Sequence, residues 1–299
     1  MSDSGWLWIV FTVLAAAAQT IRNAMQRELT AKLGTAGATH IRFLFGFPFA
    51  LCFLFALMLI TGASLPNPPV VFWPWVCLGM GAQIAATMLM LAAMEERSFV
   101  VTIAYIKTEP VQVALFGLIF LGDALSIGMV SAILIATAGV IVMSLKPGGV
   151  RSDSWRPTIL GLASGATFAM SAVGFRGAIL SLGLADFKMA ATFTLVVGLL
   201  LQAAILSGYL MLRRPDIMRA IIASWRPSLF AGFMGATASQ FWYLAFALAT
   251  AASVRTVALV EVLFAQAIST FVFGHKTTAR EGLGILLIVA GVALLIWMH

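Results

Sequence analysis

The chain has 299 residues, of which 62% are hydrophobic and 10% are charged, and its formal net charge is +7. This composition excludes an ordinary soluble enzyme, because soluble proteins are about half apolar and about a quarter charged. A strongly basic soluble protein would suggest a nucleic-acid partner, but here the basic residues fall between apolar segments, so we expect membrane lipids as partners and no nucleic acid.

Apolar segments long enough to cross a bilayer follow one another along the whole chain, and each crossing needs about 20 residues. The expected transmembrane helices cover residues 6–23, 39–61, 70–94, 98–121, 124–145, 158–176, 185–210, 227–249, 252–273 and 281–298. Helices are expected because lipid offers no partners to the backbone. We therefore predict an all-α polytopic membrane protein with ten transmembrane helices. Cys52 and Cys77 lie in apolar segments, so no disulfide is expected.

The basic residues also predict the orientation of the helices. Fourteen of the 18 Lys and Arg residues lie in or beside the loops that follow the odd-numbered segments, whereas Arg176, Lys188 and Arg255 lie on the opposite side. Cytoplasmic loops carry an excess of Lys and Arg. With ten helices, this distribution predicts that both termini are outside.

An internal repeat divides the chain into residues 1–150 and 151–299, which align when one is shifted by 152 residues. Five helices separate matched positions, and this odd number predicts two inverted five-helix repeats. Inverted repeats are a common construction in transporters, with the substrate near the midplane between them, although some channels and gene duplications share them. The matched pairs include Glu109 with Glu261, Gly122 with Gly274, and Ala138-Gly139-Val140 with Ala290-Gly291-Val292.

These motifs give the chain a family resemblance. Glu109-Pro110-Val111, Phe120 to Leu125 and Ala138-Gly139-Val140 resemble the ten-helix EamA-type branch of the drug/metabolite transporter (DMT) superfamily, with Asp123 and His275 where that family usually has glutamate. The resemblance implies two EamA-like halves and a metabolite exporter or exchanger of the cell (inner) membrane. It also implies a central cavity between helices 1–4 and 6–9. Many members have cytoplasmic termini, and the charges here predict the opposite.

Two glutamates are the main candidates for chemistry. Glu109 and Glu261 each lie near the middle of an apolar segment. An ionisable residue there is costly unless it is paired or faces a water-filled cavity, so a functional role is the default hypothesis. The hypothesis is proton coupling, or binding of a substrate ammonium group. The structural alternative is a hydrogen bond between helices.

Polar residues follow Glu109 along one helical face. Thr102, Tyr105, Glu109 and Gln112 are spaced by three or four residues, which predicts a polar stripe facing a cavity. Pro110 lacks a backbone donor, so the helix could be loosened beside the glutamate. Lys107 lies on another face, where it could pair with a second helix, snorkel outward or bind a substrate carboxylate.

Other polar residues lie in the remaining apolar segments, where they would either line a pathway or join helices. These are Gln19, Gln83, Gln240 and Tyr243. Arg255 is interpreted as a helix-end anchor, or as a partner for an anionic group at a cavity mouth. The mixed charges of Glu109, Glu261 and Lys107 would suit a small zwitterionic substrate such as an amino acid, and protons are a second candidate partner.

We therefore predict a secondary transporter that works by alternating access and is not an enzyme. The alternatives are an intramembrane enzyme acting on a lipid-linked substrate, a channel, or a non-transporting scaffold. The chain has no HExxH or GxSxG motif and no ATP-binding P-loop, so the energy source would be an ion gradient or substrate exchange. No metal or cofactor is expected. Substrate identity, direction of transport and oligomeric state are not predicted.

Overall fold

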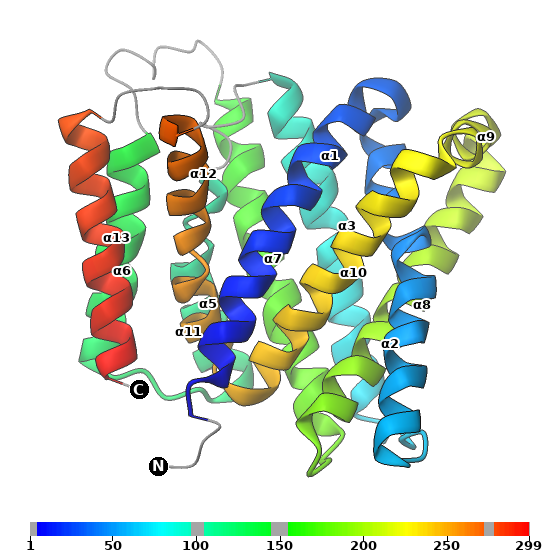
Figure 1. Cartoon of the computed structure of the whole chain (residues 1–299), viewed down its shortest axis with the longest axis horizontal. Coiled ribbons are helices and arrows are strands. Elements are labelled where there is room, and N and C mark those ends of the chain that lie inside the picture. The colour runs from blue at the N-terminus through cyan, green and yellow to red at the C-terminus, as the bar shows by residue number, and fades with distance from the viewer. Residues whose placement is uncertain (1–4, 97–104, 145–154, 272–277, 299) are drawn as a thin grey trace. The chain divides into compact units, whose positions relative to one another are not determined.

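The computed structural model describes residues 5–96, 105–144, 155–271 and 278–298, and within these ranges every regular element is a helix (Figure 1). The all-helical prediction is therefore confirmed for the described residues. Among them, five spans are long and apolar enough to cross a membrane: Glu28–Thr61, Phe72–Met94, Thr158–Ser181, Phe187–Arg213 and Ala279–Trp297. These spans are consistent with a membrane protein. The count of ten transmembrane helices stays a prediction.

The chain divides into two compact units. Unit 1 comprises Met1–Ile84 and Gly174–Ala249, and unit 2 comprises Ala85–Val173 and Thr250–His299. Each unit takes segments from both halves of the sequence, because α3 (Phe72–Glu96) and α7 (Arg156–Ser181) each begin in one unit and end in the other. The units therefore differ from the predicted repeats 1–150 and 151–299, which remain a prediction about sequence duplication.

Unit 1 is built around a pair of long helices that pack along each other, α1 (Leu7–Leu44) and α10 (Trp225–Leu248). The other helices that lie wholly in the unit are α2 (Gly46–Thr61), α8 (Phe187–Arg213) and α9 (Pro215–Ala223). One buried apolar cluster joins α1, α8, α9 and α10, and its members are Leu29, Leu33, Ile41, Leu210, Met218, Ile221 and Ala231.

Helix α1 differs from the sequence prediction, in which residues 24–38 are a loop. The helix runs on to Leu44, and its interruption is at Gly34, where φ is 68° and ψ is 174°. Polar side chains make this stretch resemble a loop in the sequence, but its residues are mostly good helix formers. Leu29 and Leu33, one turn apart, supply the buried face that stabilises it.

Among the described residues, unit 2 contains six further helical elements that lie wholly within it. They are α5 (Glu109–Phe116), the π-helix η1 (Gly117–Leu121), α6 (Ile127–Ser144), α11 (Ala251–Val257), α12 (Val260–Phe271) and α13 (Ala279–Trp297). Glycines let α6 and α13 approach at backbone distance. A Cβ added to Gly139 would lie 2.7 Å from the Gly284 carbonyl oxygen, and one added to Gly291 would lie 2.7 Å from that of Ala132.

These close contacts are reciprocal. Gly139 faces Gly284 and Ile288 on α13, while Gly291 faces Ala132 and Ala136 on α6. The 152-residue shift exchanges Gly139 with Gly291, and it also exchanges residues 132 and 136 with residues 284 and 288. A two-fold relation between two segments produces this pattern, in which residue i contacts j′ and residue j contacts i′.

Candidate functional site: a buried cluster of four charges

A break in the helical path precedes Glu109. Tyr105 and Ile106 are helical, Lys107 and Thr108 form a turn, and α5 then begins at Glu109. The Thr108 hydroxyl donates to the Tyr105 carbonyl oxygen at 2.7 Å, which stabilises the turn. Pro110 follows at the start of α5, where helices tolerate proline because the N–H groups of the first turn have no acceptor within the helix.

A second break precedes Glu261. Helix α11 ends at Val257, Ala258 and Leu259 form a turn, and α12 begins one residue before Glu261. The backbone N–H of Glu261 donates to the Ala258 carbonyl oxygen at 3.0 Å. Both glutamates therefore lie in the first turn of a helix, where the helix dipole favours a negative charge.

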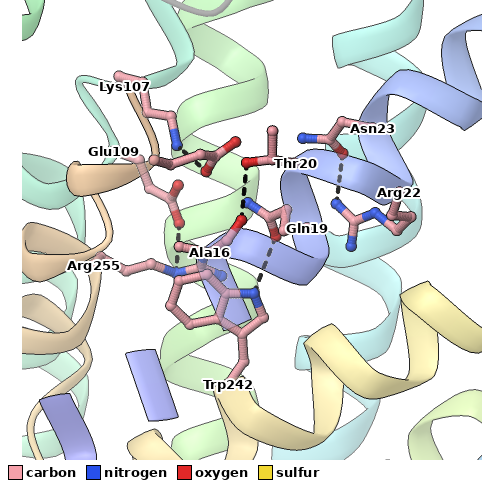
Figure 2. A network of polar contacts seen from close by, with 10 residues as sticks. Ala16, Gln19, Thr20, Arg22, Asn23, Lys107, Glu109, Trp242 and Arg255 are labelled. Atoms are coloured by element: carbon pink, nitrogen blue, oxygen red, sulfur yellow. Dashed lines mark hydrogen bonds and ion pairs between the residues drawn. The ribbon is translucent and has the colours of Figure 1, made fainter. Parts of the chain in front are cut away.

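The two glutamates form two ion pairs with cations of unit 2. Lys107 Nζ donates to Glu261 Oε2 at 2.7 Å, and Arg255 Nε lies 3.0 Å from Glu109 Oε1. The second contact is an ion pair without the alignment of a hydrogen bond. Figure 2 shows Lys107, Glu109 and Arg255 turned toward these contacts. Each pair joins a residue from the first half of the sequence to one from the second half.

The four side chains are largely removed from solvent, with exposed fractions between 8% and 10%. Two acids and two bases sum to zero charge when all are ionised, so the cluster avoids an uncompensated buried charge. The cluster is still a poor source of stability for a core, because well-packed apolar residues of similar volume often stabilise a fold as much as a buried ion pair or more. Ionisable groups kept in apolar helices therefore mark this cluster as the candidate site.

Tyr105 and Gln112 lie next to the cluster, on the side where α5 and its preceding turn meet α7. A Cβ added to Gly161 would lie 2.7 Å from Tyr105 Cβ, and one added to Gly165 would lie 3.6 Å from Gln112 Oε1. The Gln112 amide also reaches the Thr108 hydroxyl at 3.4 Å. Thr102, the first member of the predicted polar stripe, lies outside the described residues.

The remaining predicted site residues belong to unit 1, where each contacts a neighbouring helix. Gln202 donates to Gln83 at 2.9 Å, Gln240 donates to Thr192 at 2.9 Å, and Trp242 donates to Gln19 at 3.0 Å. The last contact is visible in Figure 2. The ring of Tyr243 packs on Phe175 with centroids 4.8 Å apart. These contacts match the helix-joining alternative, and a role in a pathway stays a prediction.

Of the two interpretations of Arg255, the structure favours a partner for an anionic group over a helix-end anchor. Arg255 lies within α11 with 9% of its surface exposed and pairs with Glu109. Charge balance was the available signal, because a buried carboxylate requires a compensating cation. His275 and His299 lie outside the described residues, and among the residues described no group of three or more His, Cys, Asp or Glu could hold a metal ion.

Comparisons with known proteins show the fold alone. No family model matches this chain, and no curated protein matches it. A solved structure described as "Crystal structure of protein" is similar to it, with a TM-score of 0.69 and 15% sequence identity over 98% of this chain and 95% of that one. At this identity the similarity is evidence for a shared backbone arrangement, and no activity is inferred from it.

Proposed function

We propose that this chain is a secondary transporter that moves a small metabolite, such as an amino acid, across the cell (inner) membrane. The observation that carries the proposal is the buried cluster of Lys107, Glu109, Arg255 and Glu261. Charges of both signs lie at two helix breaks in otherwise apolar segments. Broken helices beside ionisable groups are typical of the binding sites of secondary transporters.

The chemistry of the cluster fits a zwitterion. An ammonium group can replace a cation beside Glu109 or Glu261, and a carboxylate can replace a glutamate beside Arg255 or Lys107. Such an exchange leaves no charge unpaired in a medium of low dielectric constant. In the substrate-free state the four charged groups therefore pair with one another, and the substrate competes for these groups when it binds. Glu109 could also take up a proton when its pair with Arg255 opens, which would couple transport to a proton gradient.

The proposal includes the family and the architecture. The motifs around Glu109 resemble the EamA-type branch of the DMT superfamily, and reciprocal contacts of Gly139 and Gly291 support an inverted repeat for α6 and α13. Alternating access would then arise from the two inverted halves moving around a midplane site. The excess of Lys and Arg in alternate loops supports both termini outside.

A thermal-stability screen of the purified full chain tests substrate binding. The probes are amino acids, nucleobases, sugars and organic cations, applied to wild type and to Glu109→Gln. A ligand at 100 times its Kd stabilises the folded state by about 2.7 kcal/mol. We expect amino acids to raise the melting temperature of the wild type and to lose this effect in the variant. Glu28→Gln is the matched control, because Glu28 is an exposed carboxylate.

Exchange in proteoliposomes then tests transport. We expect the wild type and Glu28→Gln to exchange a labelled amino acid across the bilayer faster than protein-free liposomes, and we expect Glu109→Gln to be impaired. If exchange persists in Glu109→Gln but acidification no longer drives accumulation, Glu109 couples protons rather than holding substrate. Exchange no faster than in protein-free liposomes for every stabilising ligand contradicts the transporter proposal.

A further inference from the structure

A groove in unit 1 is separate from the charge cluster. It lies between the interruption of α1 at Gly34 and the beginning of α9, and its volume is about 400 Å³. The residues that line it are Lys32, Leu33, Gly34, Thr35, Ala36, Arg214, Asp216, Ile217 and Ala220.

Both walls of the groove are anchored in the core. The positive φ of Gly34 turns the chain, and Leu33 beside it is buried in the apolar cluster of unit 1. On the other wall, Met218 and Ile221 hold α9 on the same cluster. A Cβ added to Gly37 would lie 3.0 Å from Ile217 Cγ2, so the two walls meet closely at one end. The groove is therefore part of the folded unit.

The charged side chains of the groove are predominantly basic. Lys32 and Arg214 are exposed, and Arg214 forms an ion pair of 3.3 Å with Asp216, the one acid in the lining. A hydrogen bond from Arg214 lowers the pKa of Asp216, so this carboxylate is ionised at neutral pH. Arg213, Arg219 and Arg226 are exposed nearby in the sequence and add to the positive charge.

The surrounding surface has the composition of a membrane–water interface. Leu212, Ile222 and Trp225 are all at least half exposed, and each lies within three residues of an exposed arginine in the sequence. The Arg226 guanidinium lies 5.4 Å from the centre of the Trp225 ring. Tryptophan and basic residues beside exposed aliphatic side chains are typical of the level of the lipid headgroups.

We propose that this groove binds the headgroup of an anionic phospholipid, with its phosphate between Lys32 and Arg214. Charge complementarity selects an anion, and the apolar floor of Leu33, Ile217 and Ala220 suits the glycerol backbone. The acyl chains stay in the bilayer beside the exposed aliphatic residues. Basic side chains at this level attract anionic lipids, and losing one weakens binding about fivefold. This proposal is independent of the transport function.

The test measures the melting temperature of the full chain in a neutral detergent. The probes are dioctanoyl phosphatidylglycerol, dioctanoyl phosphatidylcholine and inorganic phosphate. We expect phosphatidylglycerol to stabilise the wild type more than either of the others. Lys32→Gln and Arg214→Gln should each need about five times more phosphatidylglycerol for the same shift. Asp216→Asn, which removes the repelling carboxylate, should need less.

Arg219→Gln is the matched control, because it removes the same charge from α9 at a position outside the groove lining. If it weakens the response as much as Arg214→Gln does, the effect is general surface charge and the site is overturned. An equal response to inorganic phosphate also overturns the lipid assignment. Lipid mass spectrometry is the second measurement: phosphatidylglycerol should co-purify with the wild type and be depleted in the Lys32→Gln/Arg214→Gln double variant.

Discussion

At the level of single residues, the ion pair between Lys107 and Glu261 determines how substitutions act on stability. Glu261→Leu leaves the Lys107 ammonium buried without its carboxylate, and breaking a buried pair in this way costs about 3–5 kcal/mol. Adding Lys107→Met removes the unpaired charge, so the double variant should recover most of that loss. Thermal unfolding in detergent compares the wild type, the single variant and the double variant. A double variant no more stable than Glu261→Leu would mean that the pair does not form.

Only part of this chemistry could be predicted from the sequence. Hydropathy alone identifies Glu109 and Glu261, because an acid in an apolar segment is conspicuous. The partner of each acid could not be assigned, because Lys107 and Glu261 are separated by 154 positions and their contact depends on the tertiary fold. Arg255 was further obscured by its place near a predicted helix end, where cations are common.

At the level of helices, the close contacts of glycines between α6 and α13 predict how alanine substitutions there affect stability. A Cβ on Gly139 would lie 2.7 Å from a backbone oxygen of α13, so Gly139→Ala must push the helices apart and should cost about 1–3 kcal/mol. Gly291→Ala should cost a similar amount, because its contacts mirror those of Gly139. Unfolding midpoints of the purified variants measure both.

Gly282→Ala is the control for this pair. Gly282 also lies on α13, but nothing lies within 4 Å of the added Cβ. Alanine is the better helix former, so the control should be neutral or more stable by up to about 1 kcal/mol. Equal losses in all three variants would show that helix separation is not the cause.

The helix break before Glu109 leads to another prediction. Pro110→Ala should leave the break in place, because Val262 holds the matching position in the second repeat and the chain breaks there as well. The expected loss of stability is about 0.4–1 kcal/mol, the usual effect of a proline in a compatible conformation. Amide exchange at Lys107 and Thr108 should stay as in the wild type. Strong new protection there would mean that the proline causes the break.

The sequence indicated a loosened helix beside Glu109 but gave no sign of the break before Glu261. Pro110 lacks a backbone donor, whereas α11 and α12 are separated by the ordinary residues Ala258 and Leu259. Hydropathy does not reveal the continuation of α1 beyond Asn23, because polar residues are typical of loops and of exposed helix faces alike. Helix α9 was missed because nine residues are too few for a transmembrane segment.

For the whole molecule, the proposed orientation can be tested by labelling. Cys52→Ala and Cys77→Ala give a background without thiols. On intact cells, an impermeant maleimide should label Asn67→Cys, in the loop after α2, and should label Arg219→Cys only after permeabilisation. The reason is that the basic loops are expected on the cytoplasmic side. The reverse pattern would put both termini inside, as in many members of the family that the chain resembles.

Composition alone predicts the class of fold, because few folds other than a bundle of membrane helices accommodate a chain this apolar. The described residues agree, since they form helices without strands and include five apolar spans. A likeness to a solved structure at 15% identity shows how loosely the backbone arrangement depends on particular side chains. The pairing of charges depends strongly on particular side chains. Hydropathy therefore predicts the class of fold but not the ion pairs.

The separation of Lys107 from Glu261 has a consequence for biosynthesis in the membrane. A ribosome adds about 5–20 residues per second, so about 8–30 seconds separate the two members of the pair, 154 residues apart, during synthesis. If the segment with Lys107 entered the lipid during that interval, it would do so without its counter-ion, and a charge at mid-bilayer costs about 2.5–3.5 kcal/mol. We therefore expect the nascent segment to be held at the translocon or at the interface until α11 and α12 emerge.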